Sequence, residues 1–150
     1  MIEKDRYIRQ LVLPEIGEKG QERLKDSKVL IIGAGGLGSP VALYLAAAGV
    51  GTLGILDYDK VSTSNLNRQI LYEDNDEGKW KVDLAACKIK KLNRRIHINV
   101  YPEKITREKY QRAREIVAEY DIVVDACDNM ATRYLVSDLT EELSIPFVYG

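Results

Sequence analysis

A glycine-rich segment at residues 33–38 has the spacing of a phosphate-binding loop. Gly33, Gly35 and Gly38 fit the pattern G-x-G-x-x-G, with a further glycine at Gly36. A run of aliphatic, β-branched residues precedes the loop and a predicted helix follows it, so backbone N–H groups and the helix N-terminus would face one point. Phosphate is the natural ligand of such an arrangement. A tight strand-to-helix turn without a ligand is the alternative interpretation.

An acidic residue at the end of the next predicted strand supports the ligand-binding interpretation. Asp57 follows Gly38 by about 20 residues, and a carboxylate at this position typically accepts hydrogen bonds from ribose hydroxyls. The loop and Asp57 therefore predict a nucleotide site. The same turn binds NAD, FAD and ATP, so residues outside it must identify the nucleotide.

Three features outside the loop bear on that choice. Residues 64–69 are polar and include Arg68, although this segment could also be a plain surface loop. Lys81 lies in the first turn of a predicted helix, where a lysine opposes the helix dipole unless an anion offsets it. Asp128 directly follows a predicted strand, at the sheet edge where ligands collect. A nicotinamide-dependent oxidoreductase would leave these charged residues without a role.

Apolar periodicity predicts strands that alternate with helices. We expect strands at 29–32, 52–56, 96–101, 122–126 and 146–150, and helices at 39–48, 79–92, 107–119 and 129–143. This order predicts a doubly wound, Rossmann-like α/β fold, in which a parallel sheet has helices on both faces.

Two regions are expected along the chain. Residues 1–27 form an N-terminal helical segment, broken near Pro14 and Gly17, and residues 28–150 form a nucleotide-binding domain. We expect this domain to be incomplete, because the chain stops within the predicted fifth strand. An uncovered terminal strand would leave a sheet edge poorly protected, so we expect a fragment, or a partner that covers the gap.

The composition excludes several classes of protein. The 150 residues are 45% apolar, enough for one domain with a real core. Basic residues number 22 and acidic residues 23, a balance that gives no field to hold a nucleic-acid backbone. No apolar run approaches the ~20 residues of a membrane span, and the first residues lack a signal core. We expect a cytoplasmic protein that binds neither nucleic acid nor membrane.

Cysteine and histidine are too scarce for several kinds of site. Cys87 and Cys127 cannot form a disulfide framework or a four-thiolate zinc site, and we expect both to pack as small thiols. His97 is the single histidine and lies in a predicted strand, where we expect no catalytic role. A Ser-His-Asp triad or a histidine-rich metal site would have to use that one residue.

Six segments, in order and with matching spacing, together resemble the ThiF/MoeB/HesA family, the bacterial and archaeal relatives of ubiquitin-activating enzymes. The resemblance extends from about residue 5 to the last residue. The segments are 6–10, 33–38, 57–59, 64–69, Lys81 and 125–129.

The resemblance implies a reaction. It is the ATP-dependent adenylation of the C-terminal glycine of a small ubiquitin-like sulfur-carrier protein, in thiamine or molybdopterin sulfur transfer, with pyrophosphate as product. Magnesium would be the co-reactant, bound by Asp128. The family resemblance also implies a homodimer, in which Arg9 would reach into the site of the partner subunit.

The resemblance further implies roles in nucleotide binding. The glycine loop and Asp57 would hold the nucleotide, with Asp57 on the ribose and Asp59 assisting it. The phosphates would contact Asn65, Arg68 and Lys81.

The chemistry of these residue types agrees with that reaction. A terminal carboxylate has a reference pKa of about 3.5, so it is already an ionised nucleophile at neutral pH and needs no general base. Attack on the α-phosphate gathers negative charge, which Arg, Lys, Mg²⁺ and aligned N–H groups stabilise. The scarcity of histidine is then no obstacle.

The chain departs from the family in its cysteine motifs. Full-length relatives carry paired Cys-x-x-Cys zinc motifs and a crossover loop with a reactive cysteine. These motifs are absent here, so we predict neither zinc nor a thioester or persulfide step.

Three functions are alternatives to carrier adenylation. They are a non-catalytic scaffold or fragment of such an enzyme, a related tRNA-modifying dehydratase, and a nicotinamide-dependent oxidoreductase.

Overall fold

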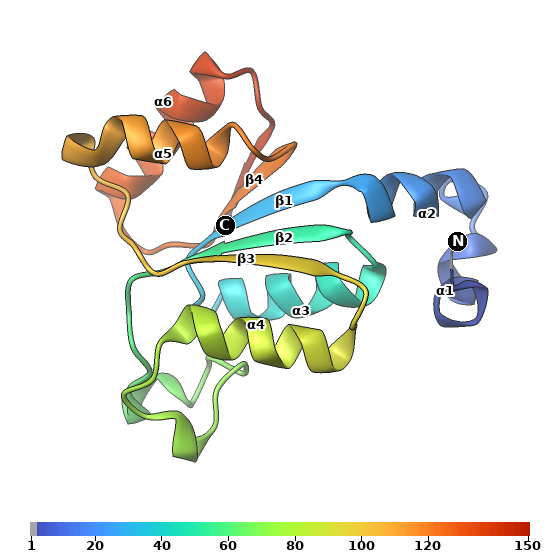
Figure 1. The fold of residues 1–150 in the computed structure, drawn as a ribbon, viewed down its shortest axis with the longest axis horizontal. Coiled ribbons are helices and arrows are strands. Elements are labelled where there is room, and N and C mark those ends of the chain that lie inside the picture. Colours follow the sequence, from blue (N-terminus) through green and yellow to red (C-terminus); the bar gives the residue numbers. More distant parts are fainter. Residues whose placement is uncertain (1–2) are drawn as a thin grey trace.

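The computed structural model describes residues 3–150 as an α/β fold around a five-stranded parallel sheet (Figure 1). All four strand pairings are parallel, in the order β3-β2-β1-β4-β5. The strands are β1 (Lys28–Ile32), β2 (Thr52–Leu56), β3 (His97–Tyr101), β4 (Ile122–Asp125) and β5 (Phe147–Tyr149). The predicted doubly wound fold is confirmed, and the strands begin and end within one or two residues of the predicted positions.

Helices cover both faces of the sheet. On one face lie α3 (Gly38–Ala48) and α4 (Lys81–Leu92), and on the other lie α5 (Tyr110–Val117) and α6 (Met130–Glu142). In the described residues no helix has the length and apolarity needed to cross a membrane. The helix expected over 107–119 is shorter: it begins with the 3₁₀ turn η3 (Arg107–Lys109) and ends at Val117. Such turns are frequent at helix N-termini.

Each face of the sheet has its own apolar core because successive strand residues point to opposite sides. In β1, Val29 and Ile31 face α3 and α4, whereas Leu30 and Ile32 face α5 and α6. All four side chains are buried, and each contributes about 1.5–3 kcal/mol relative to an exposed position. The central strand is thus held from both sides, which fixes the loop that follows it.

The helices α1 (Lys4–Leu11) and α2 (Gly17–Asp26) lie at the amino ends of the strands (Figure 1). Buried polar side chains attach them there. Gln21 Nε2 donates to the carbonyl of Ala48 at 2.9 Å, and Asn93 Nδ2 donates to the Tyr7 hydroxyl at 2.9 Å. These contacts anchor α1 and α2 against the C-terminal ends of α3 and α4, at the opposite end of the sheet from the glycine loop.

Candidate functional site

A cavity of about 660 Å³ opens at the carboxyl ends of β1, β2 and β4. The chain runs outward from β1 in both directions, to β2 and β3 on one side and to β4 and β5 on the other, so the cavity lies at the switch point of the sheet. Doubly wound folds bind ligands at this point. The predicted site residues that line it are Gly33, Gly35, Gly36, Asp57, Asp59, Asn65, Arg68, Lys81 and Asp128.

The glycine loop needs glycine for close packing. Gly33 has a φ of 97°, and a Cβ there would lie 2.7 Å from the carbonyl oxygen of Ala126. Gly38 does not line the cavity. It packs against the loop so closely that a Cβ on it would lie 1.9 Å from the Gly33 oxygen. Glycine at both positions therefore lets α3 begin directly against β1.

The same loop leaves hydrogen-bond donors open to the cavity. Within residues 3–150, the N–H groups of Gly35 and Gly36 have no protein acceptor, and no side chain caps the N-terminus of α3. Unsatisfied N–H groups at the start of a helix, together with its dipole, attract an anion such as phosphate.

Asp57 joins the loop to the end of β2. Its two carboxylate oxygens accept hydrogen bonds from the backbone N–H groups of Ala34 and Asp59, each at 2.7 Å. Burial raises the pKa of Asp57, while these two hydrogen bonds and the nearby Lys81 act in the opposite direction. Each oxygen retains a lone pair that can accept a hydrogen bond from a ligand hydroxyl.

Tyr72 holds the other side of the Ala34 peptide. Its hydroxyl donates to the Ala34 carbonyl at 2.6 Å, and burial raises the pKa of Tyr72, so the phenol stays protonated as a donor. The peptide of Ala34 is thus fixed at its N–H by Asp57 and at its oxygen by Tyr72. Sequence reasoning did not assign a role to Tyr72, because the contact joins positions 38 residues apart.

Lys81 has the anionic neighbour that its place in the helix predicts. Its Nζ lies 3.2 Å from Asp59 Oδ2, and the residue is only 4% exposed. An antiparallel bridge between Lys60 and Trp80 and a hydrogen bond from the Lys81 N–H to the Asp59 carbonyl hold the two segments together. Asp59 therefore keeps the ammonium group at the cavity wall.

Arg68 is the contrasting cation. Its guanidinium donates to the Ser64 carbonyl at 3.1 Å and to Asn67 Oδ1 at 3.0 Å, and no carboxylate pairs with it in the described chain. The preceding 3₁₀ turn, η1 (Thr63–Asn65), is stabilised by Asn65, whose Oδ1 accepts from the Ser62 N–H. The turn thus points an uncompensated positive charge at the cavity.

Asp128 lies in the loop between β4 and α6, exposed and lining the cavity. Residues 3–150 contain no cluster of three or more His, Cys, Asp or Glu side chains that could hold a metal ion by themselves. Mg²⁺ commonly binds one or two carboxylates together with substrate phosphates, so a carboxylate beside the open N–H groups of the glycine loop is a donor that fits that ion. The neighbouring Cys127 is half-buried, and burial raises its pKa to about 11, which makes it a poor nucleophile.

Of the predicted site residues, Gly38 lies directly behind the glycine loop, whereas Arg9 lies far from the cavity. It is exposed on α1, at the amino ends of the strands, and cannot reach the cavity of its own chain. Conversely, sequence reasoning gave no role to several residues that line the cavity, namely Gln69, Lys104, Asn129 and Arg133. Asn129 had a usable signal, because an Asn just before a helix is a typical N-cap, and its Oδ1 accepts from the Thr132 N–H.

Known proteins share both the sequence and the fold. The model of the ThiF family matches residues 7–150. The sulfur carrier protein adenylyltransferase of Thermus thermophilus is 49% identical over 99% of this chain and 54% of its own length. The adenylyltransferase and sulfurtransferase MOCS3 of Dictyostelium discoideum is 52% identical over 99% of this chain and 34% of its own. The chain thus spans about half or less of these relatives.

Solved structures of other proteins also share the fold of this chain. The tRNA N6-threonylcarbamoyladenosine dehydratase TcdA of E. coli, in complex with ATP, superposes with a TM-score of 0.89 at 27% identity, over 97% of this chain and 58% of that one. PaaA superposes with a TM-score of 0.86 at 34% identity, over 98% of this chain and 46% of that one.

Proposed function

This chain belongs to the ThiF family, and we propose that its cavity binds ATP and serves the adenylation of a carboxylate. The substrate we propose is the C-terminal glycine of a small ubiquitin-like sulfur-carrier protein. The Thermus relative, which is named as a sulfur carrier protein adenylyltransferase, supports this choice. The chain covers 54% of the Thermus relative, so the activity of the whole protein is part of the proposal.

One observation carries the proposal. A glycine loop with open N–H groups, a ribose-type carboxylate at Asp57 and the cations Arg68 and Lys81 converge on one cavity. A nicotinamide-dependent oxidoreductase accounts for the loop and Asp57 but gives the two cations no function. An adenylation site needs them, because negative charge grows on the α-phosphate oxygens and on the departing pyrophosphate.

Each of these cavity residues has its own role in the proposed reaction. The loop and the start of α3 hold phosphate oxygens, and Asp57 orients the ribose. Arg68 and Lys81 stabilise the charge that develops during attack by the carrier carboxylate, which is already ionised at neutral pH. Asp128 would hold Mg²⁺ together with phosphate oxygens, and the ion would neutralise charge on the leaving pyrophosphate.

Calorimetric titration of the purified protein tests the nucleotide. We expect ATP to bind in a manner that requires Mg²⁺, and NAD to give no heat. Binding of NAD instead of ATP would overturn the proposal. If ATP binds, exchange of labelled pyrophosphate into ATP in the presence of candidate carrier proteins then tests the reaction.

Replacing Asp128 by alanine should remove most pyrophosphate exchange, roughly a hundredfold, because Mg²⁺ would lose its protein ligand and the charge on the leaving pyrophosphate would be less well neutralised. Fold and thermal stability should not change, since the side chain is exposed. Asp138→Ala, an exposed aspartate on α6, is the matched control and should exchange normally. Normal exchange by Asp128→Ala would show that Asp128 is not the magnesium ligand.

Replacing Tyr72 by phenylalanine should weaken ATP binding about tenfold, the equivalent of one lost hydrogen bond that holds the loop. The Ala34 carbonyl would be left buried without its donor, so the melting temperature should also fall. Tyr44→Phe, at a 76% exposed position on α3, is the control. Unchanged affinity and stability in Tyr72→Phe would contradict the role of this contact.

We further propose that Arg9 completes the site of a second copy in a homodimer. Its exposure on α1, away from its own cavity, is what this arrangement requires. Light scattering at high protein concentration should detect a dimer, and Arg9→Ala should lower exchange without changing the dimer. A monomer at all concentrations would rule out this role for Arg9.

A tRNA-modifying dehydratase is the second candidate, because TcdA superposes on this chain with a TM-score of 0.89. It would use the same ATP site on a different carboxyl group. The formal net charge of −1 argues against a nucleic-acid substrate. ATP consumption that depends on tRNA and not on a carrier protein would favour this candidate.

A further inference from the structure

The loop that carries Asp128 is held at almost every position except Asp128 itself. The Ala126 N–H donates to Ile32 O at 2.8 Å, and the Cys127 N–H donates to Asp125 Oδ1 at 3.0 Å. Beyond the loop, Asn129 caps α6. Among residues 3–150, no hydrogen bond or ion pair holds the Asp128 carboxylate, although the segment around it is restrained.

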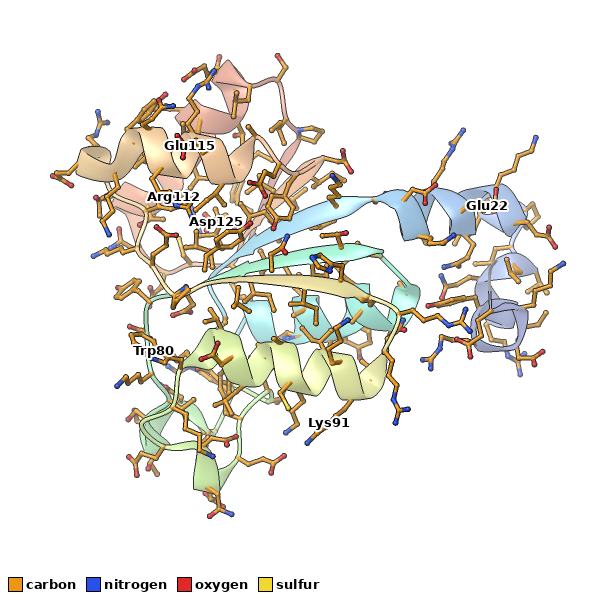
Figure 2. The ribbon with its side chains drawn as sticks, in the orientation of Figure 1. Glu22, Trp80, Lys91, Arg112, Glu115 and Asp125 are labelled. Carbon is orange, nitrogen blue, oxygen red and sulfur yellow. The ribbon has the colours of Figure 1, made fainter. Side chains whose placement is uncertain are left out.

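Arg133, one turn into α6, makes most of the remaining contacts. Its Nε donates to Asp125 Oδ2 at 2.8 Å, and its Nη2 donates to the carbonyls of Cys127 at 3.2 Å and Gly150 at 2.8 Å. Its guanidinium also lies 5.5 Å from the ring centroid of Tyr149. One side chain thus joins the end of β4, the Asp128 loop, α6 and the end of β5, and Figure 2 labels the central carboxylate of this network, Asp125.

The positive charge of Arg133 is paired with a carboxylate within this network. The side chain of Asp125 is 0% exposed and that of Arg133 is 22% exposed, so the two form a largely buried ion pair. Arg68 lines the same cavity without a carboxylate partner in the described part of the chain. Of the two arginines that line the cavity, Arg68 is therefore the one whose charge is available to phosphate, and Arg133 has a different role. The planar guanidinium suits that role, because its donors can bind a carboxylate and two carbonyls at once.

We propose that Arg133, paired with Asp125, is a positioning residue that fixes the loop so that Asp128 meets Mg²⁺ and the nucleotide phosphates in one geometry. This inference rests on the proposed function. Groups that orient a metal ligand from behind typically account for 10–100-fold in metal affinity or activity.

Arg133→Lys is the main test, because lysine keeps the charge but cannot make the forked contacts. Calorimetry with ATP at a series of Mg²⁺ concentrations should show about a tenfold higher Mg²⁺ requirement, in line with the usual effect of such orienting groups. Binding of ATP at saturating Mg²⁺ should change little. Hydrogen exchange measured by mass spectrometry should become faster over residues 126–129 and stay unchanged over the glycine loop.

Two further variants keep the test decisive. The double variant Asp125→Asn, Arg133→Met removes both charges and avoids leaving one buried alone, so it should fold while showing the same Mg²⁺ defect. Arg114→Lys, which alters the exposed pair with Glu142, is the matched control and should behave like the wild type.

The outcomes separate this proposal from the proposed function. If the wild-type protein binds no ATP, the proposed function fails. If the wild type binds ATP with Mg²⁺, and Arg133→Lys or the folded double variant shows the wild-type Mg²⁺ requirement and wild-type exchange over 126–129, the positioning role of Arg133 is overturned.

Discussion

Arg68→Ala should slow pyrophosphate exchange about a hundredfold or more, a loss at least as large as the one expected for Asp128→Ala. A charge of this kind typically contributes about 3 kcal/mol of transition-state stabilisation. Arg68 contributes as an unpaired cation, because within residues 3–150 its guanidinium donates to the Ser64 carbonyl and Asn67 and forms no salt bridge with a carboxylate. Binding of ATP measured by calorimetry should fall less than the exchange rate.

The control for this variant is Arg94→Ala, an exposed arginine that follows α4. It should retain normal exchange, and both variants should melt close to the wild-type temperature, since the Arg68 side chain is exposed and not in the core. Exchange by Arg68→Ala near the wild-type rate would exclude Arg68 from the transition state.

Gly38→Ala should remove ATP binding and destabilise the fold together. The new Cβ would lie 1.9 Å from the Gly33 oxygen and 2.8 Å from the Gly33 carbonyl carbon, so the loop or α3 must move. We expect a loss of about 3 kcal/mol in the free energy of unfolding, at the upper end of the usual cost of overpacking. Chemical denaturation and calorimetry with ATP measure the two effects.

Gly36→Ala provides the comparison within the same loop. A Cβ at Gly36 would lie 3.5 Å from Cγ of the flexible Arg68 side chain, an ordinary contact. This variant should keep its stability, and any loss of ATP binding would come from the methyl group within the cavity. Equal stability of the Gly36 and Gly38 variants would contradict the packing role of Gly38.

The elements of the fold could be predicted because their signals are local. The aliphatic run of β1, the glycines that follow it and the apolar stripe of α4 lie within single elements, where the period of the pattern matches the geometry. The glycine loop and Asp57 belong to this class too, because a strand followed by a tight turn and a helix positions them with few long-range contacts.

The partners of the site residues are a different matter. The position of Lys81 in its helix predicts an anion nearby, yet nothing in the local pattern identifies Asp59, 22 residues earlier. Asp59 becomes the partner of Lys81 because the bridge between Lys60 and Trp80 brings the two segments together. Tyr72 is a similar case, since its bond to Ala34 exists only once the chain after β2 folds back over the loop.

Residue types and spacing in this chain are thus enough to predict a doubly wound sheet and a phosphate-binding loop, because backbone geometry and apolar periodicity act over a few residues. Which charged side chains are free for a ligand, and which are paired within the protein, is decided by the tertiary structure. Arg68 and Arg133 are the same residue type and line the same cavity, but one is free and the other is paired with Asp125. Electrostatic roles depend on distance and burial, and these are set only when β4, α6 and β5 pack together.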